Sequence, residues 1–174
     1  MGLTFTVGGA KGTFEGRSAA AIAEALDRAF GAEGEWEGVP PLRFGELGDA
    51  PWGELQGRAV ADLGADNVPN LMALVGDGRG VYLPAPVQAL SLPLEEGGPL
   101  RCASLPGLRA ELEELATRWS LPLDEPGLRS LIQAHPDGEE GGVSDAPEVI
   151  AFARLALAAN EAARRDCPLW VVGP

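Results

Sequence analysis

The stretch 146-APEVIAFARLALAANEAARRDCPLWVV-172 decides the fold. Its alanine-rich part, 146–166, is apolar around much of its circumference, which predicts a long helix buried on most sides. Arg164 and Arg165 stand in its last turn, where the helix dipole favours cations. The next residues form a short apolar strand, which we expect to be inserted into a sheet. This one stretch therefore predicts both a covering helix and a strand beneath it.

Outward from this stretch, hydrophobic periodicity predicts the other elements. Strands are expected at 3–7, at 13–15 (as the second arm of a glycine-rich hairpin), on both sides of the turn GDGRG within 70–84, and at 87–94 and 99–104. Amphipathic helices are expected over 18–30, capped by Ser18 and ended by Gly31, over 105–119 after Ser104, and over 125–135 after Asp124. The sequence therefore predicts a single α+β domain over 1–174, with a mostly antiparallel sheet of about five or six strands packed against about three or four helices.

The periodicity fails between residues 32 and 57, where Trp36 and Trp52 stand among glycines, prolines and acidic residues. We interpret this region as an irregular, loop-rich insertion. Loops of this length are uncommon in compact domains and are often functional. Its two tryptophans are therefore either packing anchors or candidates for contact with a partner.

The formal net charge of −13 excludes several function classes. Lys11 is the only lysine and the arginines are dispersed, so no basic stripe is present to bind nucleic acid or an anionic membrane. The sequence has no apolar run long enough to span a membrane and no secretory signal, and its two cysteines are too few for a disulfide framework. We expect a cytoplasmic protein without a cofactor, whose acidity favours either solubility or a basic protein partner.

The segment 134-AHPDGEEGGVSD-145 contains the only histidine, His135, which continues the apolar face of the preceding helix. From Asp137 the spacing partly matches a calcium-binding EF-hand loop, with Glu139 at position three and Glu148 at position twelve. Position five is Gly141, which offers no side-chain ligand. The sequence thus contains only a weak calcium set, formed by Asp137, Glu139 and Glu148.

A structural interpretation explains most of the same segment. Asp145 and Glu148 have the spacing of a capping box for the helix that follows. Only Asp137, Glu139 and Glu140 are left without a structural role. Three solvated carboxylates on one loop indicate a charged contact surface more than a reaction centre.

Three other features carry less information. The stretch VGGAKGT (7–13) differs from a phosphate-binding loop because Gly12 separates Lys11 from Thr13. Arg79, at the tip of GDGRG, is a candidate partner contact. Cys102 and Cys167 become neighbours only if strands 100–103 and 169–172 pair.

These observations favour a non-enzymatic acidic binding protein that occludes a basic protein partner, for example a bacterial immunity or antitoxin-like inhibitor. The expected contacts are Asp137, Glu139, Glu140, Trp36, Trp52 and Arg79, and no catalytic residue is assigned. One alternative is a carboxylate-dependent enzyme with a divalent metal in the loop 137–148. Another is a scaffold subunit that forms a homo-oligomer through the alanine-rich helix or a sheet edge.

Overall fold

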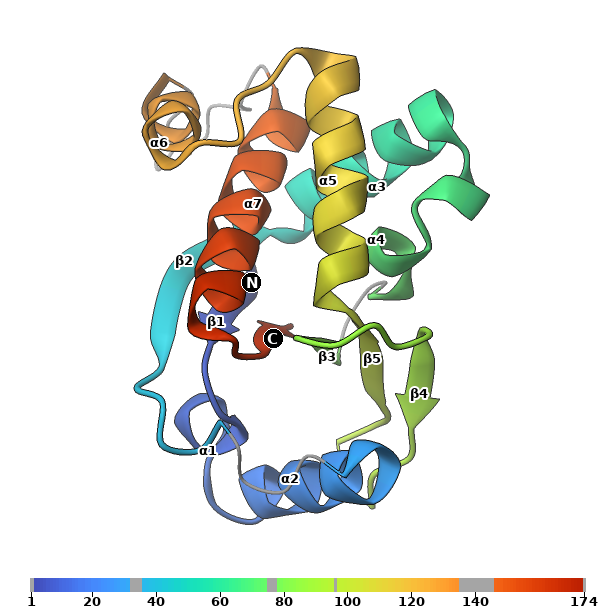
Figure 1. Cartoon of the computed structure of the whole chain (residues 1–174), viewed down its shortest axis with the longest axis vertical. Helices are drawn as coiled ribbons and strands as arrows, with labels where there is room; N and C mark the ends of the chain where they lie inside the picture. The colour runs from blue at the N-terminus through green and yellow to red at the C-terminus, as the bar shows by residue number, and fades with distance from the viewer. Residues whose placement is uncertain (1, 32–35, 75–77, 96, 135–145, 174) are drawn as a thin grey trace.

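A computed structural model describes residues 2–31, 36–74, 78–95, 97–134 and 146–173. These residues form one six-stranded sheet with helices on both faces (Figure 1). The larger group of helices, which includes α5 and α7, lies on one face, and α1 and α2 lie on the other. The predicted fold class, α+β with a mostly antiparallel sheet, is confirmed.

The sheet has the strand order β2-β1-β6-β3-β5-β4. All neighbouring strands are antiparallel except β3 and β5, which are parallel. The strands are β1 (Gly2–Val7), β2 (Leu42–Gly48), β3 (Arg79–Leu83), β4 (Leu90–Leu92), β5 (Leu100–Ser104) and β6 (Leu169–Val172). The last strand of the chain thus lies near the middle of the sheet, as its apolar sequence predicts.

Trp170 in β6 packs in the apolar cluster between the centre of the sheet and α2. Its ring is fully buried and packs edge-on against Phe14, with 5.3 Å between the ring centroids. Its indole Nε1 donates a hydrogen bond of 2.8 Å to the carbonyl oxygen of Gly8. The buried indole nitrogen is therefore satisfied, and the bond ties the last strand to the end of the first.

Helix α7 (Pro147–Arg165) covers the opposite face of the sheet and contacts α3, α5 and α6. Most of its alanines, among them Ala151, Ala158 and Ala159, are fully buried, and their small side chains allow the neighbouring helices to approach. The predicted long buried helix is confirmed. It ends at Asp166, which adopts a left-handed conformation with φ 53°.

Two other predicted helices are confirmed with small changes. Helix α5 (Leu105–Trp119) begins with the predicted cap, since the Ser104 hydroxyl accepts a hydrogen bond of 3.0 Å from Gly107 N. Helix α6 spans Glu125–Ala134. Helix α2 (Gly16–Phe30) ends at Gly31 as expected, but its N-cap residue is Glu15, so the predicted cap at Ser18 is wrong.

Several predictions for the first half of the chain are wrong. Residues 10–13 form the short helix α1 (Ala10–Thr13), not a hairpin arm. Within 70–84, α4 (Pro69–Ala73) replaces the first expected strand, and of 87–94 only β4 is strand.

The region 32–57 is not a loop-rich insertion over its second half, because 42–48 form β2 and 49–63 form α3 (Asp49–Leu63). A 3-10 turn, η1 (Ala65–Asn67), follows.

These additional elements explain why the helices outnumber the three or four expected. The sheet nevertheless has the predicted size and pairing. No helix of the described segments is both long and apolar enough to cross a membrane.

Two helical glycines allow a paired test of this packing. A Cβ on Gly107 of α5 would collide with the Asn70 side chain, whereas a Cβ on Gly57 of α3 would meet nothing within 4 Å. We expect Gly107→Ala to lower the free energy of unfolding by about 1–3 kcal/mol through overpacking. Gly57→Ala should raise it by about 0.5–1 kcal/mol, since alanine is the better helix former. Urea unfolding of both variants measures this; stabilisation by both substitutions would contradict the packing of Gly107.

The C-terminal turn of α7 predicts a pH effect. Hydrogen bonds from Arg164 and then Arg165 lower the pKa of Glu161 to about 2 from its ordinary 4.5. A lowered folded-state pKa means that Glu161 stabilises the fold above pH 4.5 and loses this contribution as the pH falls towards 2. The difference in urea midpoint between the wild type and Glu161→Gln should therefore shrink over that range. The difference in urea midpoint between the wild type and the double variant Arg164→Gln with Arg165→Gln should shrink over the same pH range. A midpoint difference that stays constant with pH would contradict the ion pair.

Candidate functional site

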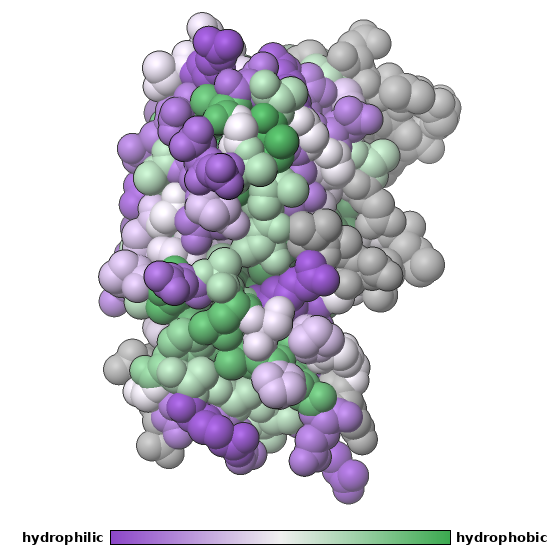
Figure 2. Space-filling view, turned by 90° about the vertical axis from the view of Figure 1, so that its right-hand side faces the viewer, coloured by the Kyte–Doolittle hydropathy of each residue, from purple (hydrophilic) through white to green (hydrophobic). Residues whose placement is uncertain are grey.

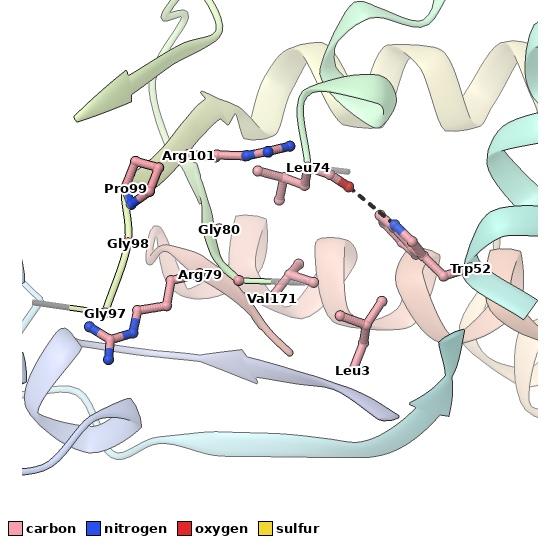
Figure 3. Close-up of a pocket in the computed structure, with 11 residues that line it drawn as sticks. Leu3, Trp52, Leu74, Arg79, Gly80, Gly97, Gly98, Pro99, Arg101 and Val171 are labelled. Carbon is pink, nitrogen blue, oxygen red and sulfur yellow. Dashed lines mark hydrogen bonds between the residues drawn. The ribbon is translucent and has the colours of Figure 1, made fainter. Parts of the chain in front are cut away.

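A pocket of about 120 Å³ opens at the end of the sheet where β3 and β5 begin (Figure 3). Leu3, Trp52, Leu74 and Val171 form its apolar wall. Arg79 and Arg101 contribute its charged groups. The pocket thus brings together Trp52 and Arg79, two residues that the sequence separately singles out as contacts.

Two glycines in the pocket wall allow neighbouring side chains to pack directly against the backbone. A Cβ on Gly80 would lie 2.7 Å from Leu74, so only glycine at this position in β3 lets the leucine pack over the strand. Gly97 has φ +80°, and a Cβ there would lie 2.5 Å from Nη2 of Arg79. The glycine backbone therefore supports the arginine side chain from one side.

The two arginines lie on opposite faces of the sheet. In the parallel pair β3–β5, Arg79 is opposite Leu100 and Gly80 is opposite Arg101. Because side chains alternate along a strand, Arg79 shares the α2 face with Leu100, and Arg101 lies on the other face. Figure 3 shows the two guanidinium groups pointing apart, that of Arg79 towards Gly97 and that of Arg101 towards Leu74.

Arg79 is half-buried, and its guanidinium carbon lies 5.6 Å from the centroid of the Phe14 ring. Within the described segments, no carboxylate lies at ion-pair distance from it. Its predicted role as a partner contact is compatible with this position and stays a prediction.

Trp52 is a packing anchor and not an exposed contact, because only 3% of its surface is accessible. Its indole Nε1 donates a hydrogen bond of 3.1 Å to the carbonyl oxygen of Leu74, and Gln56 Nε2 donates to the same oxygen. Trp36 is half-buried and packs against the apolar clusters on both sides of the sheet. Of the two alternatives open for these tryptophans, the burial of Trp52 agrees with a packing anchor, and Trp36 is packed in part.

A buried polar cluster, which no local pattern in the sequence predicts, lies between α4 and α5. The Glu111 carboxylate accepts hydrogen bonds from Asn70 N at 2.8 Å, Asn70 Nδ2 at 2.7 Å and Leu71 N at 2.7 Å. Asn70 in turn accepts from Ser104 N through its side chain and from the Tyr82 hydroxyl through its carbonyl oxygen. Although the cluster contains serine, tyrosine and glutamate, each group serves the backbone of a neighbouring element.

Burial raises the pKa of Glu111, and the hydrogen bonds from Asn70 and Leu71 oppose this rise. Burial also raises the pKa of Tyr82, and the Glu111 charge adds to the effect. The cluster therefore acts as a cap for α4: a carboxylate on α5 satisfies the N–H groups at the start of a helix about 40 residues away.

Most of the acidic loop lies outside the described residues, and with it His135, Asp137, Glu139, Glu140 and Asp145. Glu148 is described, and its carboxylate pairs with Arg58 at 2.6 Å. The helix that Glu148 opens has Ala146 as its N-cap residue.

Arg58, in turn, lies over the Trp119 ring at 4.4 Å, so Glu148 belongs to a contact between α7, α3 and α5. Among the residues that the structure describes, no group of His, Cys, Asp and Glu is arranged to hold a metal ion. Of the weak calcium set Asp137, Glu139 and Glu148, only Glu148 has a described environment, and that environment is an ion pair.

The two cysteines are free, buried and not on paired strands. Cys102 lies on β5, which pairs with β3 and β4, whereas Cys167 precedes β6. Burial raises the pKa of Cys102 to about 12 and also raises that of Cys167. Since the thiolate is the reactive form, these thiols are poor nucleophiles at neutral pH.

The pocket is therefore lined by an apolar wall and by two arginines whose guanidinium groups point apart, and its described lining contains no nucleophile or general base. Comparison with protein-family models, with curated proteins and with solved structures finds no match to this chain.

The polar cluster predicts that Glu111→Gln destabilises the fold more than Glu114→Gln, a matched substitution on the same helix. In Glu111→Gln an amide N–H₂ faces backbone N–H donors, so at least one donor stays unsatisfied. We expect this substitution to lower the free energy of unfolding by about 1–3 kcal/mol. Glu114→Gln, on the exposed side of α5, should change it by less than about 0.5 kcal/mol. Equal effects in thermal unfolding would show that Glu111 does not cap α4.

Proposed function

We propose that this chain is a non-enzymatic acidic binding protein that occludes a basic protein partner. The observation that carries the proposal is the net charge of −13, together with the pairing of several arginines with carboxylates of their own helices. An immunity or antitoxin-like inhibitor of a basic enzyme, such as a nuclease with a cleft built for phosphate, is its most concrete form.

Several arginines pair with carboxylates of their own helices. Arg28 pairs with Glu24, Arg129 with Glu125, and Arg164 and Arg165 with Glu161. These pairs leave an excess of carboxylates on the surface. Glu54, Asp66 and Glu114 are exposed and form no ion pair within the described segments. A surface of this kind attracts a basic partner and accelerates its association.

The arrangement of the polar side chains supports binding over catalysis. Ser104, Tyr82 and Glu111 serve as caps and hydrogen-bond partners within the fold, and both thiols are buried. In the proposed mechanism, long-range attraction between charges sets the association rate, and the contacts made on docking set the residence time. Asp137, Glu139, Glu140 and Arg79 are the contacts that we propose.

The proposal is tested by capture followed by kinetics. The full chain is immobilised, proteins are captured from extracts of the native host, and captured proteins are identified by mass spectrometry. We expect a basic partner whose association rate constant falls about tenfold or more between about 50 and 500 mM NaCl, because salt screens the attraction. An enzymatic assay of that partner should show inhibition.

Two variants distinguish the effect of lost negative charge on the association rate from the effect of substituting surface residues. Neutralising Glu54, Asp66 and Glu114 together should slow association. A control that exchanges Glu24 and Arg28 keeps the net charge and should leave the rate unchanged, since both side chains of this pair are highly exposed. Capture of acidic proteins only, or a rate that ignores salt, would overturn the proposal.

A further inference from the structure

Strand β4 forms one edge of the sheet and carries an uncharged, apolar strip. The whole segment 84-PAPVQALSLPL-94 contains no charged residue, although charged residues make up 22% of the chain. Leu90 is 38% exposed, and Val87, Leu92 and Leu94 are only half-buried. Figure 2 shows the apolar area over the lower half of the face on which β4 lies. One side of this strand is paired with β5, and the sheet ends on the other.

The opposite edge of the sheet is different. Strand β2 carries the exposed Arg43, and its pairing with β1 is interrupted by a register shift between Thr4 and Thr6. Charges and bulges of this kind prevent an edge from pairing with another strand. Strand β4 carries neither a charge nor a register shift, so of the two edges it is the one available for pairing, over the short length that its flanking prolines leave.

We propose that β4 pairs with β4 of a second copy of this chain, in an antiparallel register centred on Ser91. In this register Ser91 lies opposite Ser91 of the second copy, and Leu90 lies opposite Leu92. Ala89 lies opposite Pro93, and Gln88 opposite Leu94. The two six-stranded sheets then continue into each other across a twofold axis.

Charge explains why a second copy fits this strip. Every pair within three residues of Ser91 is uncharged, and the nearest described acid, Glu95, falls opposite Val87. Like charges directly opposite each other destabilise a strand pair, and this register contains none. On a chain of net charge −13, the strip is a surface on which two copies approach without placing acid against acid.

Side-chain direction adds an apolar contact to the backbone pairing. Leu90 is in register with Cys102 and Leu92 with Leu100, and both partners belong to the apolar cluster beneath α2. Leu90 and Leu92 therefore lie on the α2 face of the sheet. Pairing places Leu90 of each copy against Leu92 of the other, which continues this apolar cluster across the interface.

The strand ladder between the two copies is short, so we expect their association to be weak. In this register Pro93, which lacks an N–H group, lies opposite Ala89, so the ladder is confined to about five residues per copy, 89–93. An interface of this size falls at the weak, transient end of specific association. The two net charges also repel each other, so the dimer should tighten as salt is added.

Sedimentation equilibrium of the full chain tests the proposal. We expect monomer at about 10 μM, a growing dimer fraction between about 100 μM and 1 mM, and a dissociation constant that falls at least threefold from about 50 to 500 mM NaCl. This salt dependence has the opposite sign to that expected for a basic partner. Failure of one proposal is therefore distinguishable from failure of the other.

Two leucines of nearly equal exposure, Leu90 and Leu42, supply the matched variants. Leu90→Asp places an acid close to the twofold axis in both copies and should weaken the dimer at least tenfold. Leu42→Asp, at a residue 37% exposed on β2, should leave it unchanged. Circular dichroism confirms that both variants fold. Hydrogen exchange of the wild type should show amides within 89–92 becoming protected as the concentration rises.

A chain that stays monomeric at 1 mM and 500 mM NaCl would overturn the proposal. So would a dimer that Leu42→Asp disrupts as much as Leu90→Asp, because the contact would then not be specific to β4. Protection that fails to rise at 89–92 in a dimeric sample would place the contact elsewhere and also overturn it.

Discussion

The insertion of β6 between β1 and β3 is the interaction on which the rest of the structure depends. Strands β2 and β1 lie on one side of β6, and β3, β5 and β4 lie on the other, so only the last strand joins the two parts of the sheet. Phe5 near the N-terminus is in register with Val171 near the C-terminus. The sheet is therefore complete only when both ends of the chain have met, and the helix before β6 is necessarily drawn over the sheet.

The buried polar groups follow from the short elements that surround this sheet. Helix α4 has five residues and no cap of its own, because its N-cap residue is Val68. Its first N–H groups would be unsatisfied in the core without an acceptor from elsewhere. Glu111 on α5 supplies that acceptor, and Asn70 extends the cluster to β5. The residues that most resemble catalytic groups thus satisfy backbone hydrogen bonds.

The predictability of each element depended on whether its signal was local. Helix α5 carries its own cap, Ser104, and α7 and β6 have continuous apolar patterns, so all three were predicted correctly. Helix α3 was missed because Gly53 and Gly57 interrupt its pattern, and α4 was missed because Glu111 is distant in sequence. The pocket was only half visible: Trp52 and Arg79 were singled out, but glycine spacing and strand register place them together.

The strong negative charge and the uncharged edge of β4 are connected physically. Sheet edges are commonly protected by lysines, but Lys11 is the only lysine of this chain and lies in α1. Two prolines and the short length of β4 give local protection, and the net charge of the whole molecule gives the remainder. Repulsion between whole molecules depends on salt, with a screening length of about 8 Å at physiological ionic strength. A basic partner that neutralises surface carboxylates reduces the same repulsion. The two proposed associations are therefore linked, and by reciprocity each should favour the other where their surfaces do not overlap.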